Sequence, residues 1–178
     1  MSNIESNSVF FENVSADRNN IVEDLSLCSR AQEFQTEIAQ RGYSYFFSWF
    51  GLPIIQVPED VLFFAELFYR VKPTVVIETG VARGGSIIFW SSMFAISKEM
   101  FGLDGKVIGL DIFITDEARQ NITCNGLSRR IHLIEGSSVL KDSYAAVEKL
   151  VDGDSGRKIL VLDSNHTEDH VLRELELY

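Results

Sequence analysis

The sequence predicts an α/β protein in which helices cover both faces of a parallel sheet. Four short apolar segments alternate with helix-like segments between residues 74 and 178, which is typical of parallel strands joined by right-handed crossovers. The first of these segments ends in an acid and a glycine-rich turn, Glu78 to Ser86, before an apolar helix. Parallel sheets bind nucleotide-like ligands at such a turn.

Composition limits the class of protein further. The chain has 178 residues, of which 46% are hydrophobic, and a formal net charge of −10. This is enough for one domain with a core, and the acidic balance argues against nucleic acid as a partner. Cys28 and Cys124 are far apart and suggest neither a disulfide framework nor a zinc site. No signal peptide or transmembrane segment is visible, so we expect a cytoplasmic protein.

The chain divides by composition into two parts. Residues 1–42 are expected to form a polar N-terminal segment, loosely ordered to about Ser29, with a short helix at Ala31–Arg41. Residues 43–178 are expected to form the α/β domain. This domain opens with an aromatic cluster, Tyr43–Phe50, which we assign to the core rather than to a substrate wall.

Each strand is predicted by a short aliphatic run with an acid at its end. The strands are Thr74–Thr79, Lys106–Asp111, Arg130–Glu135 and Lys158–Asp163. The last would be an exposed apolar edge, which favours self-association into a homo-oligomer. Sheets of this type have further strands, so we expect the domain to be truncated after the fourth.

The helices are predicted by apolar residues at helical spacing together with start and stop residues. They are Pro58–Val71, Gly85–Met100, Asp116–Asn125 with Gly126 as its C-cap, Asp142–Val151, and a last helix capped by Thr167 and continuing through Leu177.

The glycine-rich turn carries the first ligand prediction. Gly80, Gly84 and Gly85 allow a sharp turn and close approach of a ligand, and Glu78 places a carboxylate at the strand tip. As a dinucleotide motif the turn is flawed, because Ala82 stands where pyrophosphate must approach. The pattern acid-x-Gly-x-Ala-x-Gly suits S-adenosylmethionine, which has no phosphate. A plain strand–helix turn would explain the same residues.

The next two strand ends support a nucleoside. Asp111 could accept hydrogen bonds from the ribose hydroxyls, as acids at this position do for both NAD and S-adenosylmethionine. Gly136, Ser137 and Ser138 follow the third strand and could contact adenine through backbone amides and hydroxyl groups. A turn followed by a helix cap explains these three residues equally well.

The fourth strand end carries the groups suited to catalysis. Asp163 lies at the tip, where a substrate or a divalent cation would bind, and His166 could act as a ligand or proton acceptor. A carboxylate beside an amide and a hydroxyl favours Mg²⁺ over zinc. His170 is interpreted as a surface residue.

Four segments in order resemble the cephalosporin hydroxylase / rhamnosyl O-methyltransferase family. They are Glu78–Ser86, Gly105–Asp111, Ile134–Ser138 and Leu162–His166, within a likeness from Tyr43 to Tyr178. The resemblance implies a Rossmann-like fold and an S-adenosylmethionine-dependent O-methyltransferase. Its acceptor would be a hydroxyl of a sugar or a small natural product, that is, a small molecule or glycan.

The resemblance also implies roles for single residues. Glu78, Gly80 and Ala82 would line the methionine end of the cofactor, Asp111 would hold the ribose, and the serines would lie near adenine. Asp163 would be the first carboxylate ligand of Mg²⁺, with the remaining acids on a further strand. The ion would lower the pKa of the substrate hydroxyl, with His166 as the base or as a partner of the ligands.

Two alternatives remain open from the sequence. One is an NAD(P)-dependent sugar-modifying oxidoreductase, which Ala82 and the lack of a Tyr-x-x-x-Lys pair disfavour. The other is a non-catalytic, nucleoside-binding remnant, which an incomplete sheet would favour.

Overall fold

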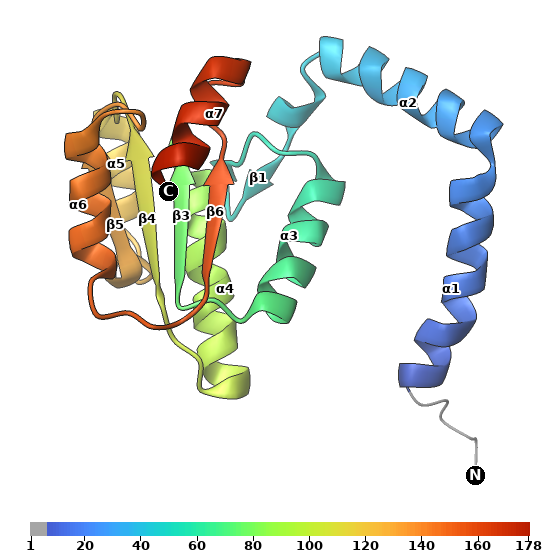
Figure 1. The fold of residues 1–178 in the computed structure, drawn as a ribbon, viewed down its shortest axis with the longest axis horizontal. Helices are drawn as coiled ribbons and strands as arrows, with labels where there is room; N and C mark the ends of the chain where they lie inside the picture. The colour runs from blue at the N-terminus through green and yellow to red at the C-terminus, as the bar shows by residue number, and fades with distance from the viewer. Residues whose placement is uncertain (1–6) are drawn as a thin grey trace. The chain divides into compact units, whose positions relative to one another are not determined.

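A computed structural model describes residues 7–178 of the chain (Figure 1). The chain divides into two compact units between Tyr43 and Ser44. The first unit contains helices α1 (Asn7–Glu23) and α2 (Leu25–Gln40). Asp24 separates them and caps α2, because its carboxylate accepts a hydrogen bond of 2.9 Å from the backbone N–H of Leu27.

These helices correct the prediction of a loosely ordered segment up to Ser29. Residues 1–6 lie outside the described residues, but residues 7–29 are helical except at Asp24. The polar composition misled the prediction, because a helix satisfies its backbone hydrogen bonds internally even when its side chains stay in water. α2 has no buried residue. The predicted helix at Ala31–Arg41 is the second half of α2.

A short 3-10 helix η1 (Tyr43–Phe46) spans the boundary, and the second unit continues with an antiparallel pair, β1 (Ser48–Trp49) and β2 (Leu52–Pro53). Trp49 packs edge-on against Phe89, with ring centroids 5.1 Å apart. Tyr45, Phe46 and Phe50 are exposed instead. The assignment of the whole aromatic cluster to the core is therefore right for Trp49 and wrong for these three residues.

The central sheet has four parallel strands in the order β5-β4-β3-β6 (Figure 1). Their bounds differ from the predicted ones by at most one residue at either end. They are β3 (Val75–Thr79), β4 (Lys106–Asp111), β5 (Ile131–Glu135) and β6 (Lys158–Leu162). β3 is buried along its whole length, because it lies between two strands and under helices on both faces.

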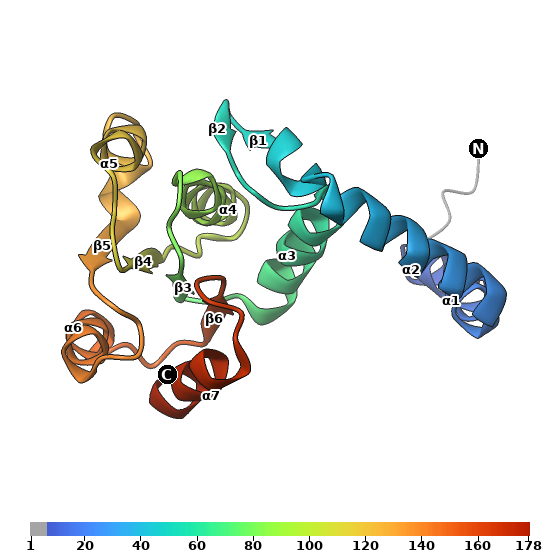
Figure 2. The same cartoon turned by 90° about the horizontal axis from the view of Figure 1, so that it is seen from above.

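Helices cover both faces of this sheet (Figure 2). One face carries α3 (Pro58–Val71), α4 (Gly85–Phe101) and α5 (Asp116–Thr123), and the other carries α6 (Lys141–Val151) and α7 (Glu168–Leu177). The larger core lies under α4, whose Phe89, Trp90 and Phe94 are fully buried. Within the described chain no helix is both long enough and apolar enough to cross a membrane.

Two predicted caps differ in the structure. α5 ends before Gly126 because the Asn125 side-chain amide donates to the carbonyls of Asn121 and Ile122, at 2.9 and 3.0 Å. Its C-cap residue is Cys124. Thr167 is the N-cap residue of α7, but its side chain makes no capping hydrogen bond.

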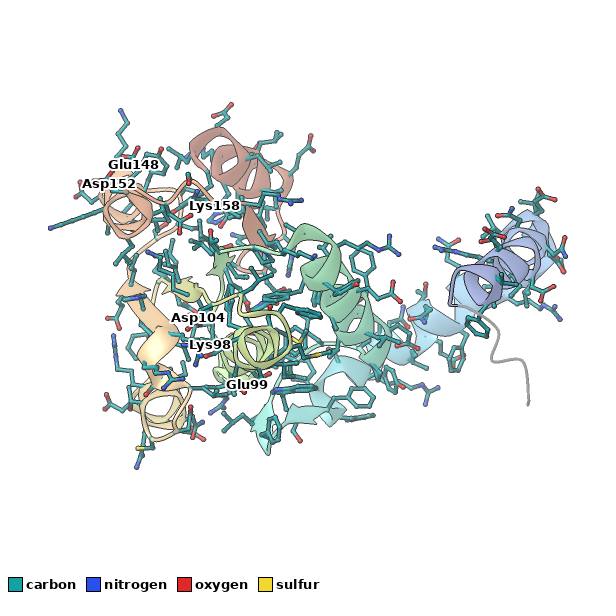
Figure 3. The ribbon with its side chains drawn as sticks, turned by 90° about the horizontal axis from the view of Figure 1, so that it is seen from below. Lys98, Glu99, Asp104, Glu148, Asp152 and Lys158 are labelled. Carbon is teal, nitrogen blue, oxygen red and sulfur yellow. The ribbon has the colours of Figure 1, made fainter. Side chains whose placement is uncertain are left out.

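A network of charges ties down the starts of β4 and β5, at the opposite end of the strands from their tips. Asp104, just before β4, accepts from Lys98 Nζ at 2.6 Å and from Arg130 Nε at 2.7 Å. Lys98 is in the last turn of α4 and Arg130 directly precedes β5. Figure 3 shows the Lys98 and Asp104 side chains beside each other. Asp104 therefore joins a helix end to two strand starts.

The strand order creates a crevice between β3 and β6. These strands are neighbours, yet β3 continues into α4 on one face and β6 into α7 on the other (Figure 2). Loops that leave adjacent strands toward opposite faces open a gap at the strand tips, and this is where open α/β sheets bind ligands.

Candidate functional site

Two cavities lie at the carboxyl ends of the strands. The first cavity has a volume of about 300 Å³ and is lined by loops following all four strands and by α7. Its lining residues are Gly80, Ala82, Leu110, Asp111, Ile112, Ser137, Ser138, Asp163, Ser164, Asn165 and His170. It thus brings together predicted residues from four separate segments of the sequence.

The second cavity has a volume of about 360 Å³ and lies against the other side of the glycine-rich turn. Its lining residues are Ser44, Tyr45, Pro53, Ile54, Ile55, Gly80, Val81, Ala82, Arg83, Gly85, Ser86, Asp163 and His166. Gly80, Ala82 and Asp163 line both cavities. The cavities therefore adjoin at the tips of β3 and β6.

The glycines of the turn allow protein segments to pack closely. A Cβ on Gly80 would lie 2.2 Å from the carbonyl oxygen of Asp163, and one on Gly85 would lie 2.2 Å from that of Pro53. Gly80 and Gly84 also have φ values of +95° and +86°, which favour glycine. The space beside these Cα atoms is filled by protein, whereas we expected room for a ligand there.

Asp111 braces the turn from the tip of β4. Its Oδ2 accepts hydrogen bonds from the backbone N–H groups of Val81 at 2.8 Å and Ala82 at 3.1 Å. Ala82 has φ +46°, a left-handed conformation that costs a non-glycine residue about 1–2 kcal/mol. Within residues 7–178, Oδ1 accepts only from the N–H of Phe113, at 3.2 Å. Asp111 lines the first cavity as predicted, but one of its oxygens already holds the turn.

Glu78 lies beneath the turn and lines neither cavity. Its side chain is 1% exposed and accepts hydrogen bonds from Ser86 Oγ at 2.5 Å and Trp90 Nε1 at 2.6 Å. Burial raises the pKa of Glu78 from 4.5 to about 8, against the lowering effect of the two donors. We expected this carboxylate at the methionine end of a ligand. It instead faces α4, because β3 turns this side of the strand toward that helix.

Asp163 and His166 lie at the tip of β6, where we expected catalytic groups. Asp163 Oδ2 accepts from Gln56 Nε2 at 2.8 Å, and His166 Nε2 lies 3.6 Å from Asp163 Oδ1. Burial raises the pKa of Asp163, although the nearby imidazole of His166 acts to lower it. His166 is 73% exposed and lines only the second cavity. Gln56 had no signal in the sequence, because it is 107 residues away.

Metal-binding side chains do not cluster at this tip. Among residues 7–178 there is no group of three or more His, Cys, Asp or Glu side chains arranged to hold a metal ion. Asp163 is the predicted metal ligand. Its Oδ2 accepts from Gln56, whereas the nearest polar group to Oδ1 within residues 7–178 is the His166 ring, at 3.6 Å. It can offer one carboxylate oxygen to a cation.

The loop after β5 is fixed by its neighbours. The N–H of Gly136 donates to the carbonyl of Asp111 at 2.8 Å, and a Cβ on Gly136 would lie 2.7 Å from Ser143 Oγ. Gly136 lines neither cavity, whereas Ser137 and Ser138 line the first. The predicted serines thus reach the site through a turn that Gly136 makes possible.

His170 was wrongly interpreted as a surface residue. Its side chain is 20% exposed, lines the first cavity, and has its Nε2 3.0 Å from Ser138 Oγ. A spacing of four residues places His170, Glu174 and Tyr178 on one face of α7. That spacing is the signal in the sequence that indicates a shared helix face for these three residues.

Comparison with known proteins gives a family. The family model for Rhamnosyl O-methyltransferase/CmcI matches residues 41–178 of this chain. Rhamnosyl O-methyltransferase of Mycobacterium leprae (strain TN) is 25% identical over 130 residues, which cover 73% of this chain and 53% of that protein. The enzyme of the same name from Mycobacterium tuberculosis (strain ATCC 25618 / H37Rv) is 25% identical over 133 residues, covering 73% and 50%. The chain spans about half the length of these relatives.

Solved structures of CmcI also resemble the chain. One with SAH has a TM-score of 0.45 and 18% identity, covering 72% of this chain and 58% of that one. One with Mg and SAM has a TM-score of 0.46 and 18% identity, covering 70% and 48%.

Proposed function

The chain belongs to the Rhamnosyl O-methyltransferase/CmcI family, and from this premise we propose that it is an S-adenosylmethionine-dependent O-methyltransferase. Its acceptor would be a hydroxyl of a sugar or another small molecule. One observation carries the proposal beyond family membership: two cavities meet at Gly80, Ala82 and Asp163. Methyl transfer needs such a pair, one for the donor and one for the acceptor, with a shared boundary where the methyl group crosses.

We assign the cofactor to the first cavity. Asp111 Oδ1 would accept from the ribose hydroxyls, while Oδ2 keeps its bonds to the turn. Ser137 and Ser138 would contact the adenine, and Gly80 and Ala82 would flank the methionine part. Gly84, Gly85 and Gly136 would shape this cavity through packing rather than contact. Glu78, under the turn, would support it from the core.

We assign the acceptor to the second cavity, with His166 as the base. S-adenosylmethionine supplies a methyl group on a cationic sulfur; transfer forms a C–O bond, breaks the C–S bond and leaves neutral S-adenosylhomocysteine. His166 would accept the proton of the acceptor hydroxyl, which makes the oxygen a better nucleophile. Asp163, 3.6 Å from His166 Nε2, would orient the ring and stabilise its protonated form. The surrounding walls would align the acceptor oxygen with the sulfur.

We propose Mg²⁺ as a second cofactor, with Asp163 as a ligand. The support for this ion is the type of donor atom that Asp163 offers. Mg²⁺ prefers oxygen ligands and is often held by one or two carboxylates together with water and substrate. Asp163 Oδ1 can be one of these, and with the ion bound this oxygen would serve the metal rather than the His166 ring that lies 3.6 Å from it. The ion would supply a positive charge that lowers the pKa of a bound hydroxyl.

Three broader features are also proposals. Residues 43–178 would form the methyltransferase domain and residues 1–42 a separate N-terminal part, which is supported by the division between Tyr43 and Ser44. A cytoplasmic location is supported by the acidic composition. A homo-oligomer is supported by the position of β6 at the edge of the described sheet, and light scattering during size-exclusion chromatography would measure it.

Calorimetry tests the cofactor. The full chain is titrated separately with S-adenosylmethionine, S-adenosylhomocysteine and NAD. We expect saturable binding of the first two and no heat with NAD. Binding of NAD alone would overturn the proposal in favour of an oxidoreductase, and no binding of any of the three would overturn it outright.

A turnover assay tests the reaction. Tritium from methyl-labelled S-adenosylmethionine is followed into a panel of sugars and small hydroxyl compounds, with and without Mg²⁺. Transfer to an acceptor oxygen supports the methyltransferase. Cofactor binding without transfer to any acceptor would favour a binding protein instead.

A further inference from the structure

His170 is the centre of a polar network beside the first cavity. Its Nε2 lies 3.0 Å from Ser138 Oγ, 3.3 Å from Ser164 Oγ and 3.4 Å from Glu174 Oε1. Ser164 Oγ also donates to Glu174 Oε1 at 2.8 Å. One ring nitrogen therefore faces oxygens from three separate segments: the loop after β5, the loop after β6, and the next turn of α7.

The topology makes these contacts unusual. β5 and β6 are the two outer strands of the described sheet, three strand spacings or about 14 Å apart at roughly 4.8 Å per spacing. Their loops cannot touch through the sheet. His170 bridges them over the tips of β3 and β4, where Gly80 and Asp111 line the same cavity. His170 thereby lines the cavity on the side of α7.

Glu174 on α7 and Tyr178, the C-cap residue of this helix, add two more contacts to the network. Glu174 is 0% exposed, and its Oε2 has no hydrogen-bond partner among residues 7–178. Its other oxygen, Oε1, meets both Ser164 Oγ and His170 Nε2, so Glu174 helps to position these two side chains. Tyr178, one turn further, donates from its hydroxyl to the carbonyl of Ser138 at 3.0 Å. α7 thus holds the Ser138 loop at two points, its side chain and its main chain.

We infer that His170 is a positioning residue for the nucleoside end of the first cavity. Through Nε2 it holds Ser138 against Ser164, and this contact sets the position of the Ser137–Ser138 loop relative to Asp111. This inference rests on the proposed function, which assigns the nucleoside to this cavity. We further expect the affinity for adenosine, which is the cofactor without its methionine chain, to depend on the contact between His170 Nε2 and Ser138 Oγ.

Two substitutions separate the ring nitrogens. In His170→Gln the amide reaches about as far as Nε2, whereas in His170→Asn it reaches only about as far as Nδ1. We expect His170→Asn and His170→Ala to weaken adenosine and S-adenosylhomocysteine about tenfold each, which corresponds to the loss of one or two hydrogen bonds. His170→Gln should stay within about threefold of the parent. The matched control is His132→Gln, on the exposed side of β5, which should change neither affinity.

The measurement is calorimetry with adenosine and with S-adenosylhomocysteine, beside thermal unfolding of each variant. The inference is supported if His170→Asn weakens the affinity for both ligands by the same factor and His170→Gln restores it. If the parent binds both ligands and His170→Ala binds them equally well, the inference is overturned while the proposed function stands. Restoration by Asn instead of Gln also overturns it, because Nδ1 would then contact the ligand. A parent that binds neither ligand overturns both.

Ser138→Ala provides a second test that leaves α7 intact. It removes the hydroxyl next to Nε2 from the other side of the contact. Because Ser138 is also assigned to the adenine, we expect at least the same loss for adenosine, and for the double variant with His170→Ala a loss smaller than the sum of the two single losses, since both changes remove the same contact. Additive losses would contradict the inference even if the single variants behave as expected.

Discussion

The indole N–H of Trp90 donates a hydrogen bond of 2.6 Å to the buried carboxyl of Glu78. Ser86, one helical turn earlier, donates to the other oxygen at 2.5 Å. These bonds fasten the tip of β3 to α4 directly below the turn that separates the two cavities. The carboxyl group that precedes the glycine-rich turn therefore connects β3 to α4 inside the core.

Glu78 should make folding stability depend on pH. Burial raises its pKa to about 8 in the folded protein, from 4.5, so the folded state retains a proton that the unfolded state loses. Its contribution favours folding below pH 4.5, declines as the pH rises toward 8 and is constant above that. Glu78→Gln removes this dependence. We expect the difference in free energy of unfolding, Glu78→Gln minus parent, to rise by roughly 1 kcal/mol or more between pH 5 and pH 8.

Urea unfolding of both proteins at several pH values measures this difference. Comparing the two proteins cancels the titration of every other group to first order. A difference that does not change with pH would show that Glu78 has an ordinary pKa in the folded state.

Gly80 should be far less tolerant of a side chain than another glycine with the same backbone conformation. Gly80→Ala would place a Cβ 2.2 Å from the carbonyl oxygen of Asp163, and backbone cannot move aside cheaply. Gly153 has φ +74° and no atom within 4 Å of an added Cβ, so Gly153→Ala carries only the cost of the left-handed conformation, about 1 kcal/mol. We expect Gly80→Ala to cost about 3 kcal/mol or more.

Thermal or urea unfolding of the two alanine variants checks this ranking. The Gly153 variant serves as the matched control for backbone strain. Equal losses of stability would mean that the contact between the turn and the tip of β6 is loose. The close packing of Gly80 against Asp163, where the two cavities meet, would then be absent.

Asp104 should stabilise the protein except in strong acid. The bonds from Lys98 and then Arg130 hold the pKa of Asp104 well below its usual range. A depressed pKa gives stability that is present above the unfolded pKa of 3.8 and is lost as the pH falls toward the folded value. Asp104 is 40% exposed while Arg130 is 5% exposed. Water screens the carboxylate, but Asp104→Ala leaves a buried guanidinium without this partner.

We expect Asp104→Ala to lower the free energy of unfolding at pH 7 by roughly 2 kcal/mol. Glu99→Ala, a neighbouring change on α4 outside this network, is the control and should have little effect. Measured at pH 2.5, the difference between Asp104→Ala and the parent should shrink. An unchanged difference would assign the effect to packing rather than to charge.

The fold could be predicted because its signals are local. The runs ending at Thr79, Asp111, Glu135 and Leu162 carry enough β-branched and aliphatic residues to define parallel strands within one residue of their observed bounds. The glycine-rich turn could be found for the same reason. Parallel topology then brings the strand ends together, which places Asp111, Ser137, Ser138 and Asp163 around one cavity.

The remaining features depend on contacts between distant segments. Gln56 reaches Asp163 across 107 residues, and no pattern around Gln56 indicates this. Glu78 was misplaced because a carboxylate at a strand tip suggests exposure, while the two donors on α4 become visible only once the helix is packed. His170 was missed because a histidine on a short helix is usually solvated.

His166 should affect turnover without affecting cofactor affinity. It lines the second cavity but not the first, and its Nε2 lies 3.6 Å from Asp163 Oδ1. If it accepts the proton of the acceptor hydroxyl, His166→Ala should lower kcat by about 100-fold or more, the usual contribution of a general base. The Kd for S-adenosylhomocysteine should stay within about twofold, because no wall of the first cavity is removed. The measurements are initial rates with a hydroxyl acceptor found in the panel and calorimetry on the same preparation. A weaker Kd with unchanged kcat would instead place His166 in the cofactor site, and the assignment of donor and acceptor to the two cavities would have to be exchanged.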